Sequence, residues 1–224
     1  PYCYDLATFS PVGAIAFDEG SWADLVATNK ASLATYGAHH LMGNITGNQD
    51  RPRFTSLADG TLDVNEDMKF QGWTRDIQHG GDDGYAKMRL LMSYLTSVPG
   101  IPCVYYGDEI ADVGGNDPDN RRMMRFDNLN EEETRTKQWT SDWAKLRRSR
   151  MSMLYGTTTF EIVDEHMLHI QRTYLNEVTD LYLNRDNQPH ALPSDHAAAS
   201  TLAGMLSTEG TLPAFGAVAF GTTL

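Results

Sequence analysis

The spacing of hydrophobic and polar positions changes along the chain and divides it into two regions. Up to about residue 155, apolar residues recur at helical spacing in three segments, with short apolar runs between them. From residue 156 onward the spacing is closer to two, which is typical of strands with one buried face. We therefore expect an α/β portion over residues 1–155 and an all-β domain over residues 156–224.

Three segments of the first region have the signals of helices. Ser21 as N-cap and Gly37 as a left-handed cap predict a helix over residues 22–36. Asp83 predicts the start of a second helix, over residues 84–98. The expected buried positions are Leu25, Val26, Leu33 and Tyr36 on the first helix and Met88, Leu91, Met92 and Leu95 on the second. A third helix is predicted over residues 131–155, with glutamates in its first turn and basic residues toward its end, as the helix dipole favours.

Strands are predicted in both regions. In the C-terminal region they cover residues 157–163, 167–173, 178–183 and 212–220. In the N-terminal region, the short apolar runs over residues 40–46 and 101–106 also have strand character. We expect the second run to be buried, with Cys103 as a buried free thiol.

Two polar clusters follow these N-terminal strands, and a parallel α/β scaffold places functional side chains at that end of its strands. The first cluster is Gly47-Asn48-Gln49-Asp50, and the second runs from Gly107-Asp108-Glu109 to Asp117-Pro-Asp-Asn-Arg121. Taken alone, an aspartate such as Asp50 is more typical of a turn than of a catalyst. Taken alone, Asp117 and Arg121, four residues apart, are more typical of an ion pair that stiffens a loop than of a binding site.

Composition and charge exclude several classes of function. The net charge of −12 argues against a nucleic-acid partner, which needs a basic patch. No apolar run approaches the roughly 20 residues that span a bilayer. Two cysteines make neither a disulfide framework nor a metal set. His39 and His40 are adjacent, and His166 and His169 are three apart on a predicted strand, so we expect no zinc site.

The two clusters together carry a resemblance to a known family. The strand 101–106 with its Gly-Asp-Glu, and the stretch Asn44 to Phe54 with Asp50 followed by Pro-Arg, resemble the last two barrel strands of the α-amylase family, glycoside hydrolase family 13. The Asp-Pro-x-x-Arg element resembles neopullulanase and cyclomaltodextrinase most closely. The resemblance implies the C-terminal portion of a (β/α)8 TIM barrel, about strands 6–8, over residues 1–155 and a β-sandwich over residues 156–224.

The resemblance also implies roles for four residues. Asp50 matches the family's third acidic residue, which stabilises the transition state by holding sugar hydroxyls. Asp117 and Arg121 match a pair that binds a glucose on the non-reducing side of the cut. Gln49 stands where the family usually has histidine, and it can still donate a hydrogen bond to a sugar hydroxyl. Natural variation, tuned specificity and loss of activity all remain open as explanations of Gln49.

Two further expectations concern the second cluster and its neighbour. Arg53 matches a family arginine whose expected role is to hold the loop. Asp108 and Glu109 belong to barrel architecture by the same resemblance, so we do not assign them a catalytic role. Tyr105 and Tyr106 could stack against a sugar or pack in the core.

The family's nucleophile and general acid have no match here. About 155 residues fall short of the ~250 of a complete barrel, and a retaining glycosidase needs two catalytic carboxylates. We therefore expect a C-terminal fragment of a longer retaining enzyme, inactive alone on starch, maltodextrin or cyclomaltodextrin. Exposed strand edges of an incomplete barrel predict self-association or a partner that supplies the missing N-terminal half.

Other interpretations remain open at this point. A transglycosylase of the same family and a non-catalytic glucan-binding or assembly protein both fit the motifs, and Gln49 modestly favours the second. An α-glucan oligosaccharide is the expected ligand, and no cofactor is expected, although the resemblance leaves room for calcium in the full-length enzyme. The family favours a secreted or periplasmic location, and a cytoplasmic one stays open.

Overall fold

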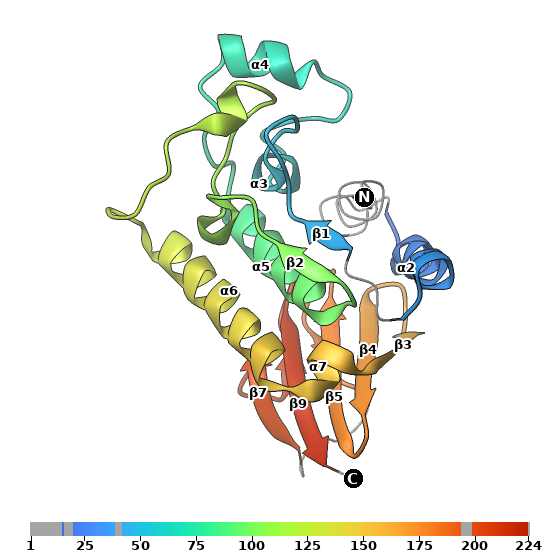
Figure 1. Cartoon of the computed structure of the whole chain (residues 1–224). Coiled ribbons are helices and arrows are strands. Elements are labelled where there is room, and N and C mark those ends of the chain that lie inside the picture. The colour runs from blue at the N-terminus through green and yellow to red at the C-terminus, as the bar shows by residue number, and fades with distance from the viewer. Residues whose placement is uncertain (1–14, 16–19, 39–41, 194–198, 224) are drawn as a thin grey trace.

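The computed structural model describes residues 15, 20–38, 42–193 and 199–223. The described residues up to 155 contain helices and one short parallel strand pair, and an antiparallel sheet follows (Figure 1). Predictions on Cys3, His39 and His40 lie outside the described residues. None of the helices among the described residues combines the length and apolar character that crossing a membrane requires.

The first described helix, α2 (Trp22–Tyr36), has the predicted bounds. The Ser21 hydroxyl accepts a hydrogen bond from the Asp24 amide at 3.1 Å, and Gly37 ends the helix with a φ of 86°. Its buried residues are Trp22, Leu25, Val26, Asn29 and Ser32. The prediction that Tyr36 is buried is wrong, since 46% of this residue is exposed on the last turn.

Strands β1 (Gly43–Ile45) and β2 (Ile101–Cys103) pair in parallel. The predicted strand over residues 101–106 is therefore too long. Its ladder stops because the Tyr105 amide donates to the Thr46 hydroxyl at 2.9 Å instead of to a backbone carbonyl. The expected burial is also wrong: Ile101 is 46% exposed and Cys103 is half-buried, because β1 is the one strand that pairs with β2 among the described residues.

The polar stretch after β1 contains two short helices that the pattern did not predict. Helix α3 (Phe54–Ala58) is buried throughout, whereas α4 (Met68–Thr74) buries none of its residues. Asp67 caps α4, and its carboxylate accepts hydrogen bonds from the amides of Lys69 and Phe70 at 3.1 and 3.0 Å. Helix α4 therefore owes its form to local capping and to the loops around it.

Helix α5 (Asp82–Ser97) connects this region to β2. It begins one residue before the predicted cap: Gly81 takes the N-cap position, and Asp83 lies in the first turn. The predicted stripe of Met88, Leu91, Met92 and Leu95 is confirmed, with each residue 2% exposed or less. Leu90 and Tyr94 on the opposite side are also buried, so α5 is enclosed on all sides.

The predicted third helix is two helices, α6 (Glu131–Ser149) and α7 (Met151–Tyr155). Asn130 and Glu133 form a capping box at the start of α6. The break falls at Arg150, whose backbone is extended at φ −120° and ψ 131°. Its side chain donates to the Thr179 hydroxyl and the Val178 carbonyl, both at 2.8 Å, so contact with the sheet interrupts the helix.

The C-terminal region is a five-stranded antiparallel sheet in the order β3-β4-β5-β9-β7. Its strands are β3 (Thr157–Ile162), β4 (Met167–Tyr174), β5 (Glu177–Asn184), β7 (Ser200–Gly204) and β9 (Ala217–Thr223). A small second sheet joins β6 (His190–Ala191) to β8 (Thr211–Leu212). The predicted strand over residues 212–220 is thus divided between β8 and β9, because a turn closed by the Gly216 amide and the Pro213 carbonyl interrupts it.

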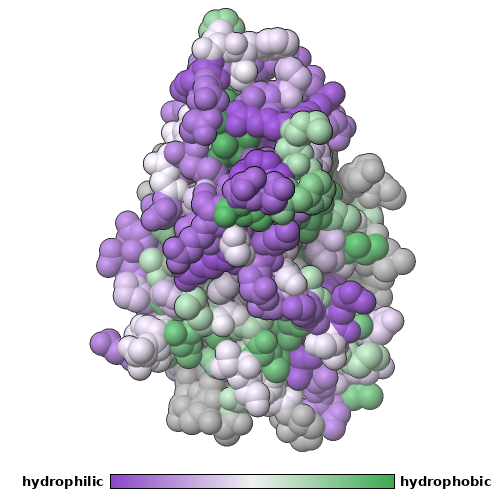
Figure 2. Space-filling view, turned by 90° about the vertical axis from the view of Figure 1, so that its left-hand side faces the viewer, coloured by the Kyte–Doolittle hydropathy of each residue, from purple (hydrophilic) through white to green (hydrophobic). Residues whose placement is uncertain are grey.

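The core lies mainly between this sheet and the helices. One face of the sheet shares a continuous cluster with α2, α5 and α6, around residues such as Trp22, Met92, Trp143, Leu168 and Leu181. The other face forms a smaller cluster that includes Leu212 of β8. Two sheets around this second cluster are consistent with the expected β-sandwich. On the α6 side, hydrophilic residues dominate the upper half of the surface, where the loops gather (Figure 2).

Candidate functional site

The candidate site residues come from the loops after β1 and β2. Thr46 connects the two strand ends: its amide donates to the Cys103 carbonyl at 3.1 Å, and its hydroxyl donates to Asp108 at 2.5 Å. The chain then turns through residues 47–50 on one side and residues 107–122 on the other. The parallel pairing therefore brings both polar clusters to the same edge, as the pattern predicted.

Arg53 is the side chain that fixes the two loops together. It is 2% exposed and donates to the carbonyls of Asn120 and Tyr106 at 3.1 and 2.6 Å and to Asp108 at 2.9 Å. Its guanidinium carbon also lies 4.4 Å from the centroid of the Tyr105 ring. These contacts agree with the expected role of Arg53 in holding the loop, and they give Tyr105 a structural partner.

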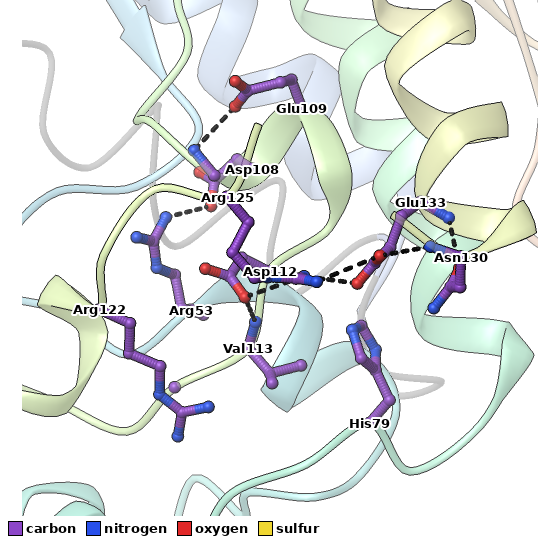
Figure 3. A network of polar contacts seen from close by, with 12 residues as sticks. Arg53, His79, Asp108, Glu109, Asp112, Val113, Arg122, Arg125, Asn130 and Glu133 are labelled. Atoms are coloured by element: carbon purple, nitrogen blue, oxygen red, sulfur yellow. Dashed lines mark hydrogen bonds and ion pairs between the residues drawn. The ribbon is translucent and has the colours of Figure 1, made fainter. Parts of the chain in front are cut away.

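Asp108 and Glu109 face different groups. Burial raises the pKa of Asp108 to about 6, although its ion pair with Arg53 and its hydrogen bond from Thr46 oppose the shift. Glu109 accepts a hydrogen bond from the Gly107 amide at 2.7 Å (Figure 3). Both carboxylates thus serve the turn that follows β2.

The four predicted site residues lie together at the surface. Arg121 contacts the carboxylates of Asp117 and Asp50 at 2.9 and 3.6 Å, and its Nε donates to the Gln49 carbonyl at 3.2 Å. The Gln49 amide donates to Asp50 at 2.9 Å. The loop-stiffening pair that Asp117 and Arg121 suggested is therefore present, and the same guanidinium reaches across to the first loop.

These side chains are exposed to solvent, whereas that of Arg53 is buried. The side chain of Asp50 is 64% exposed, and those of Arg121 and Asp117 are 45% and 32% exposed. Two carboxylates, one guanidinium and one amide offer acceptors and donors on a small surface. Such a group suits a neutral ligand with many hydroxyl groups, each of which donates and accepts.

One anchor of this cluster was not predicted from the sequence. Asn120 is fully buried, and its amide donates to the carbonyls of Asn48 and Arg51 at 3.1 and 2.5 Å. It therefore sets the position of the first loop beside the second. Nothing in the run Asp-Pro-Asp-Asn-Arg distinguishes this asparagine from its half-buried or exposed neighbours.

A second polar network, also missed from the sequence, lies beside the site at the start of α6 (Figure 3). Arg125 pairs with Glu133 at 2.5 Å and approaches Asp112 at 3.7 Å. His79 stacks on the Tyr85 ring with centroids 4.2 Å apart, and neither of its ring nitrogens has a hydrogen-bond partner among the described residues. Burial lowers the pKa of His79, and the nearby carboxylates of Asp59 and Glu133 oppose this.

Among the described residues, His166 and His169 are separate from the site. His169 contacts Glu161 and Asp180 of the sheet at 3.0 and 2.9 Å, whereas His166 lies before β4 near Glu165. Within the described ranges, no group of three or more His, Cys, Asp or Glu side chains has the geometry of a metal site.

Comparisons with known proteins agree with this geometry. No family model matches the chain. A cyclomaltodextrinase from Geobacillus thermopakistaniensis is 31% identical over 116 residues, which are 51% of this chain and 19% of the relative. A cyclomaltodextrinase from Thermoanaerobacter pseudethanolicus is 27% identical over 157 residues, 69% of this chain and 23% of the relative.

Solved structures extend the similarity to nearly the whole chain. An α-amylase from Geobacillus thermoleovorans, solved with acarbose, has a TM-score of 0.73 at 24% identity, and the match covers 98% of this chain and 47% of that one. A cyclic maltosyl-maltose hydrolase from Arthrobacter globiformis has a TM-score of 0.72 at 22% identity over 99% of this chain and 44% of that one. At these identities the structures establish the fold, while the cyclomaltodextrinases carry the sequence relationship.

The chain is therefore similar to the α-amylase family in sequence and in fold, and these similarities support its membership. It corresponds to the C-terminal portion of these glycoside hydrolase family 13 enzymes, as the two strand-end motifs predicted. The chain spans about a fifth of the length of the curated relatives it matches and under half of the solved structures. Its relatives are α-glucan-active enzymes by name.

Proposed function

We propose that this chain is the C-terminal portion of an α-amylase-family hydrolase and forms the glucan-binding side of its active site. The observation that carries the proposal is the exposed cluster of Gln49, Asp50, Asp117 and Arg121 at the ends of two parallel strands. The family relationship and the sugar complexes of similar structures support the glucan as ligand. Acarbose and maltotriose are the sugars in two of those complexes.

In this proposal each residue of the cluster has a separate task. Asp50 accepts hydrogen bonds from sugar hydroxyls at the cleaved residue and stabilises the oxocarbenium-like transition state of a retaining mechanism. Asp117 and Arg121 bind the next glucose on the non-reducing side. Gln49, whose amide donates to Asp50 at 2.9 Å, orients that carboxylate. Because Arg121 contacts both Asp117 and Asp50, it would couple the two sugar positions.

We also propose the domain division that the pattern predicted, with a partial barrel over residues 1–155 and a sandwich over residues 156–224. The parallel pair β1–β2 with helix α5 between its strands is the connection that a (β/α)8 barrel repeats. On this view β1 and β2 are its last two strands.

An incomplete barrel leaves an apolar edge to be covered. Ile101, Val104 and Tyr106 on and after β2 are 46%, 43% and 38% exposed. We propose that a second copy or an N-terminal half of the barrel covers them. Sedimentation velocity tests this: the 224-residue chain should associate with increasing concentration, and a monomer across the micromolar range would count against it.

Binding and turnover by the 224-residue chain test the glucan proposal. Calorimetric titration with maltotriose should show binding, and Asp50→Asn and Asp117→Asn should each weaken it by about tenfold through loss of a charge-assisted hydrogen bond. Asp127→Asn, at an exposed aspartate outside the cluster, is the matched control. Absence of binding in the parent chain would overturn the proposal.

A hydrolysis assay distinguishes an inactive fragment of a longer enzyme from a chain that is an active enzyme by itself. With neither nucleophile nor general acid assigned, the chain should release no reducing sugar from starch or cyclomaltodextrin. Measurable hydrolysis, abolished by a substitution in this chain, would contradict the fragment interpretation. A non-catalytic glucan-binding protein remains the second candidate, because Gln49 replaces the family's usual histidine.

A further inference from the structure

The turn that carries Gln49 and Asp50 begins at Asn48 and ends at Arg51. The Arg51 amide donates to the Asn48 carbonyl at 3.4 Å, and the Asp50 amide donates to the side-chain oxygen of Asn48 at 2.8 Å. The side chain of Asp50 is 64% exposed, so packing against neighbours does not fix its carboxylate. The direction of that carboxylate therefore depends on what holds the two ends of the turn.

One buried side chain holds both ends. The amide of Asn120 donates to the carbonyl of Asn48 at 3.1 Å and to that of Arg51 at 2.5 Å. Asn120 is 0% exposed, and its Oδ1 has no hydrogen-bond partner among the described residues. A buried acceptor without a partner costs free energy, so the contribution of this amide lies in its two donated hydrogen bonds.

The next residue along the chain, Arg121, contacts the same turn. Its guanidinium lies 3.6 Å from the Asp50 carboxylate, and its Nε donates to the Gln49 carbonyl at 3.2 Å. Its side chain is 45% exposed, whereas that of Asn120 is buried. Because the two residues are adjacent, the grip of Asn120 on the ends of the turn also sets the separation between Asp50 and Arg121.

Gly114 leaves the backbone at Asn120 little room to move. A Cβ on Gly114 would lie 3.1 Å from the Asn120 Cα and 3.0 Å from the Asp119 carbonyl oxygen. The Gly114 carbonyl in turn accepts a hydrogen bond from the Arg53 amide at 3.1 Å. The backbone that carries Asn120 is thus enclosed between Gly114 and the first loop.

We propose that Asn120 is a positioning residue of the glucan site, which holds Asp50 where one α-glucan can contact Asp50, Asp117 and Arg121 together. This inference rests on the proposed function. A turn that must be ordered when the sugar binds loses affinity to that ordering, and a turn fixed beforehand does not. Asn120 acts on the sugar only through Asp50 and Arg121, since it is buried beneath them.

The test replaces the amide by an apolar group of similar size. In calorimetric titrations of the 224-residue chain, Asn120→Leu should weaken maltotriose binding by about tenfold, because both ends of the turn lose their donor. Asn184→Leu is the matched control. Asn184 is also 0% exposed, and its amide donates to the carbonyls of Gln188 and Pro213 at 2.8 and 2.9 Å, but in the C-terminal sheet. It should lower the urea midpoint of unfolding and change maltotriose affinity by less than about twofold.

A double-mutant cycle separates positioning from a purely structural role. When Asp50→Ala is already present, Asn120→Leu should weaken maltotriose binding by less than about twofold, because the carboxylate that it positions is gone. Full loss in both backgrounds would show that Asn120 does not act through Asp50 and would overturn the inference.

Gly114→Ala gives a milder displacement that does not depend on the folding of Asn120→Leu. The added Cβ must push the Asn120 backbone aside by a few tenths of an ångström, so maltotriose affinity should fall by about two- to threefold. If the parent chain binds maltotriose and neither folded variant changes the affinity, the positioning role is refuted and the proposed site stands. If the parent chain does not bind maltotriose, the proposed function itself fails, and the positioning role with it.

Discussion

Two sets of arginines in this molecule, one in the upper loops and one in the lower body, have different partners. In the loops, arginines pair with carboxylates: Arg53 with Asp108, Arg121 with Asp117, Arg122 with Asp119 and Arg125 with Glu133. In the body, the buried Arg147 and Arg172 pair with no carboxylate among the described residues. Their partners are backbone carbonyls at and after the end of α5, those of Thr96, Ser97, Val98 and Gly100, and that of Gly156.

Each use of arginine follows from the local backbone. The end of a helix leaves carbonyl groups without partners and with partial negative charge, so a buried cation there is stabilised without a counter-ion. Burial still lowers the pKa of Arg147 to about 10 and that of Arg172 to about 9, which leaves both charged at neutral pH. In the loops, Arg53 and Arg121 also donate to backbone carbonyls, but each has a carboxylate partner as well.

Within the loops, burial separates structural ion pairs from those that we assign to binding. Arg53 and Asp108 are each 1% exposed at the side chain, whereas Arg121 and Asp117 are 45% and 32% exposed. A buried pair whose partner is removed is costly, whereas an exposed pair contributes about 0–1 kcal/mol. We infer that the exposed cluster is free to serve binding because the buried pair beneath it holds the loops.

The largest expected effect is therefore at Arg53. Arg53→Met should lower the free energy of unfolding by about 3–5 kcal/mol at pH 8, because Asp108 is left buried without its counter-ion. The loss should shrink toward pH 5, where Asp108 can take up a proton. Urea unfolding at the two pH values measures both effects, and Arg121→Met is the matched control at an exposed pair. A loss of under about 1 kcal/mol at Arg53 would contradict the assignment.

The next largest effect is expected where α5 meets the sheet. Arg147→Met should lower the free energy of unfolding by about 2–4 kcal/mol, because the carbonyls of Thr96, Val98 and Gly100 lose their donor. Unlike the loss at Arg53, this one should stay constant between pH 5 and pH 8, since no carboxylate is involved. The neighbouring Arg148 is exposed, and Arg148→Met should cost little. A clear pH dependence of the Arg147 loss would refute the contrast.

Two histidines, His79 in the loops and His169 in the sheet, have pKa values that are shifted in opposite directions. Burial lowers the pKa of His79, so proton uptake favours the unfolded chain and stability from this group falls as pH drops below about 6.5. Burial also acts on His169, but hydrogen bonds to Asp180 and Glu161 outweigh it and raise the pKa. Its stabilisation is fully present below about 6.5 and is lost as pH rises through the folded value.

The expected consequence is a pair of opposite pH slopes. The stability lost in His169→Gln should be larger at pH 5.5 than at pH 7.5, and that lost in His79→Gln should be smaller, each by about 1 kcal/mol or less. Urea unfolding of the three proteins at both pH values measures this. If the stability losses of the two variants changed with pH in the same direction, one of the two histidine environments would be misassigned.

The sequence predicted regular elements better than it predicted the loops. The bounds of α2 and the buried stripe of α5 follow from caps and from apolar spacing, which are local. The split between α6 and α7 was missed because it depends on Arg150 reaching Thr179, a contact across 29 residues. The short β2 was missed because a hydroxyl of β1's loop, that of Thr46, interrupts the ladder.

The site shows the same division. Gln49, Asp50, Asp117 and Arg121 were placed together by motif, and they do lie together. Asn120, the buried anchor between the loops, and the network of Arg125 and Glu133 were not found, because a polar residue that is buried by tertiary contacts has no distinct signal in the sequence.

The most direct test of the account compares binding with stability in Arg121→Ala. We predict that maltotriose affinity falls by about tenfold or more, because the residue that contacts Asp50, Asp117 and Gln49 is removed. The free energy of unfolding should change by less than about 1 kcal/mol, as for an exposed ion pair. Unchanged affinity, or a loss of affinity accompanied by a stability loss as large as that of Arg53→Met, would contradict the claim that this cluster serves binding.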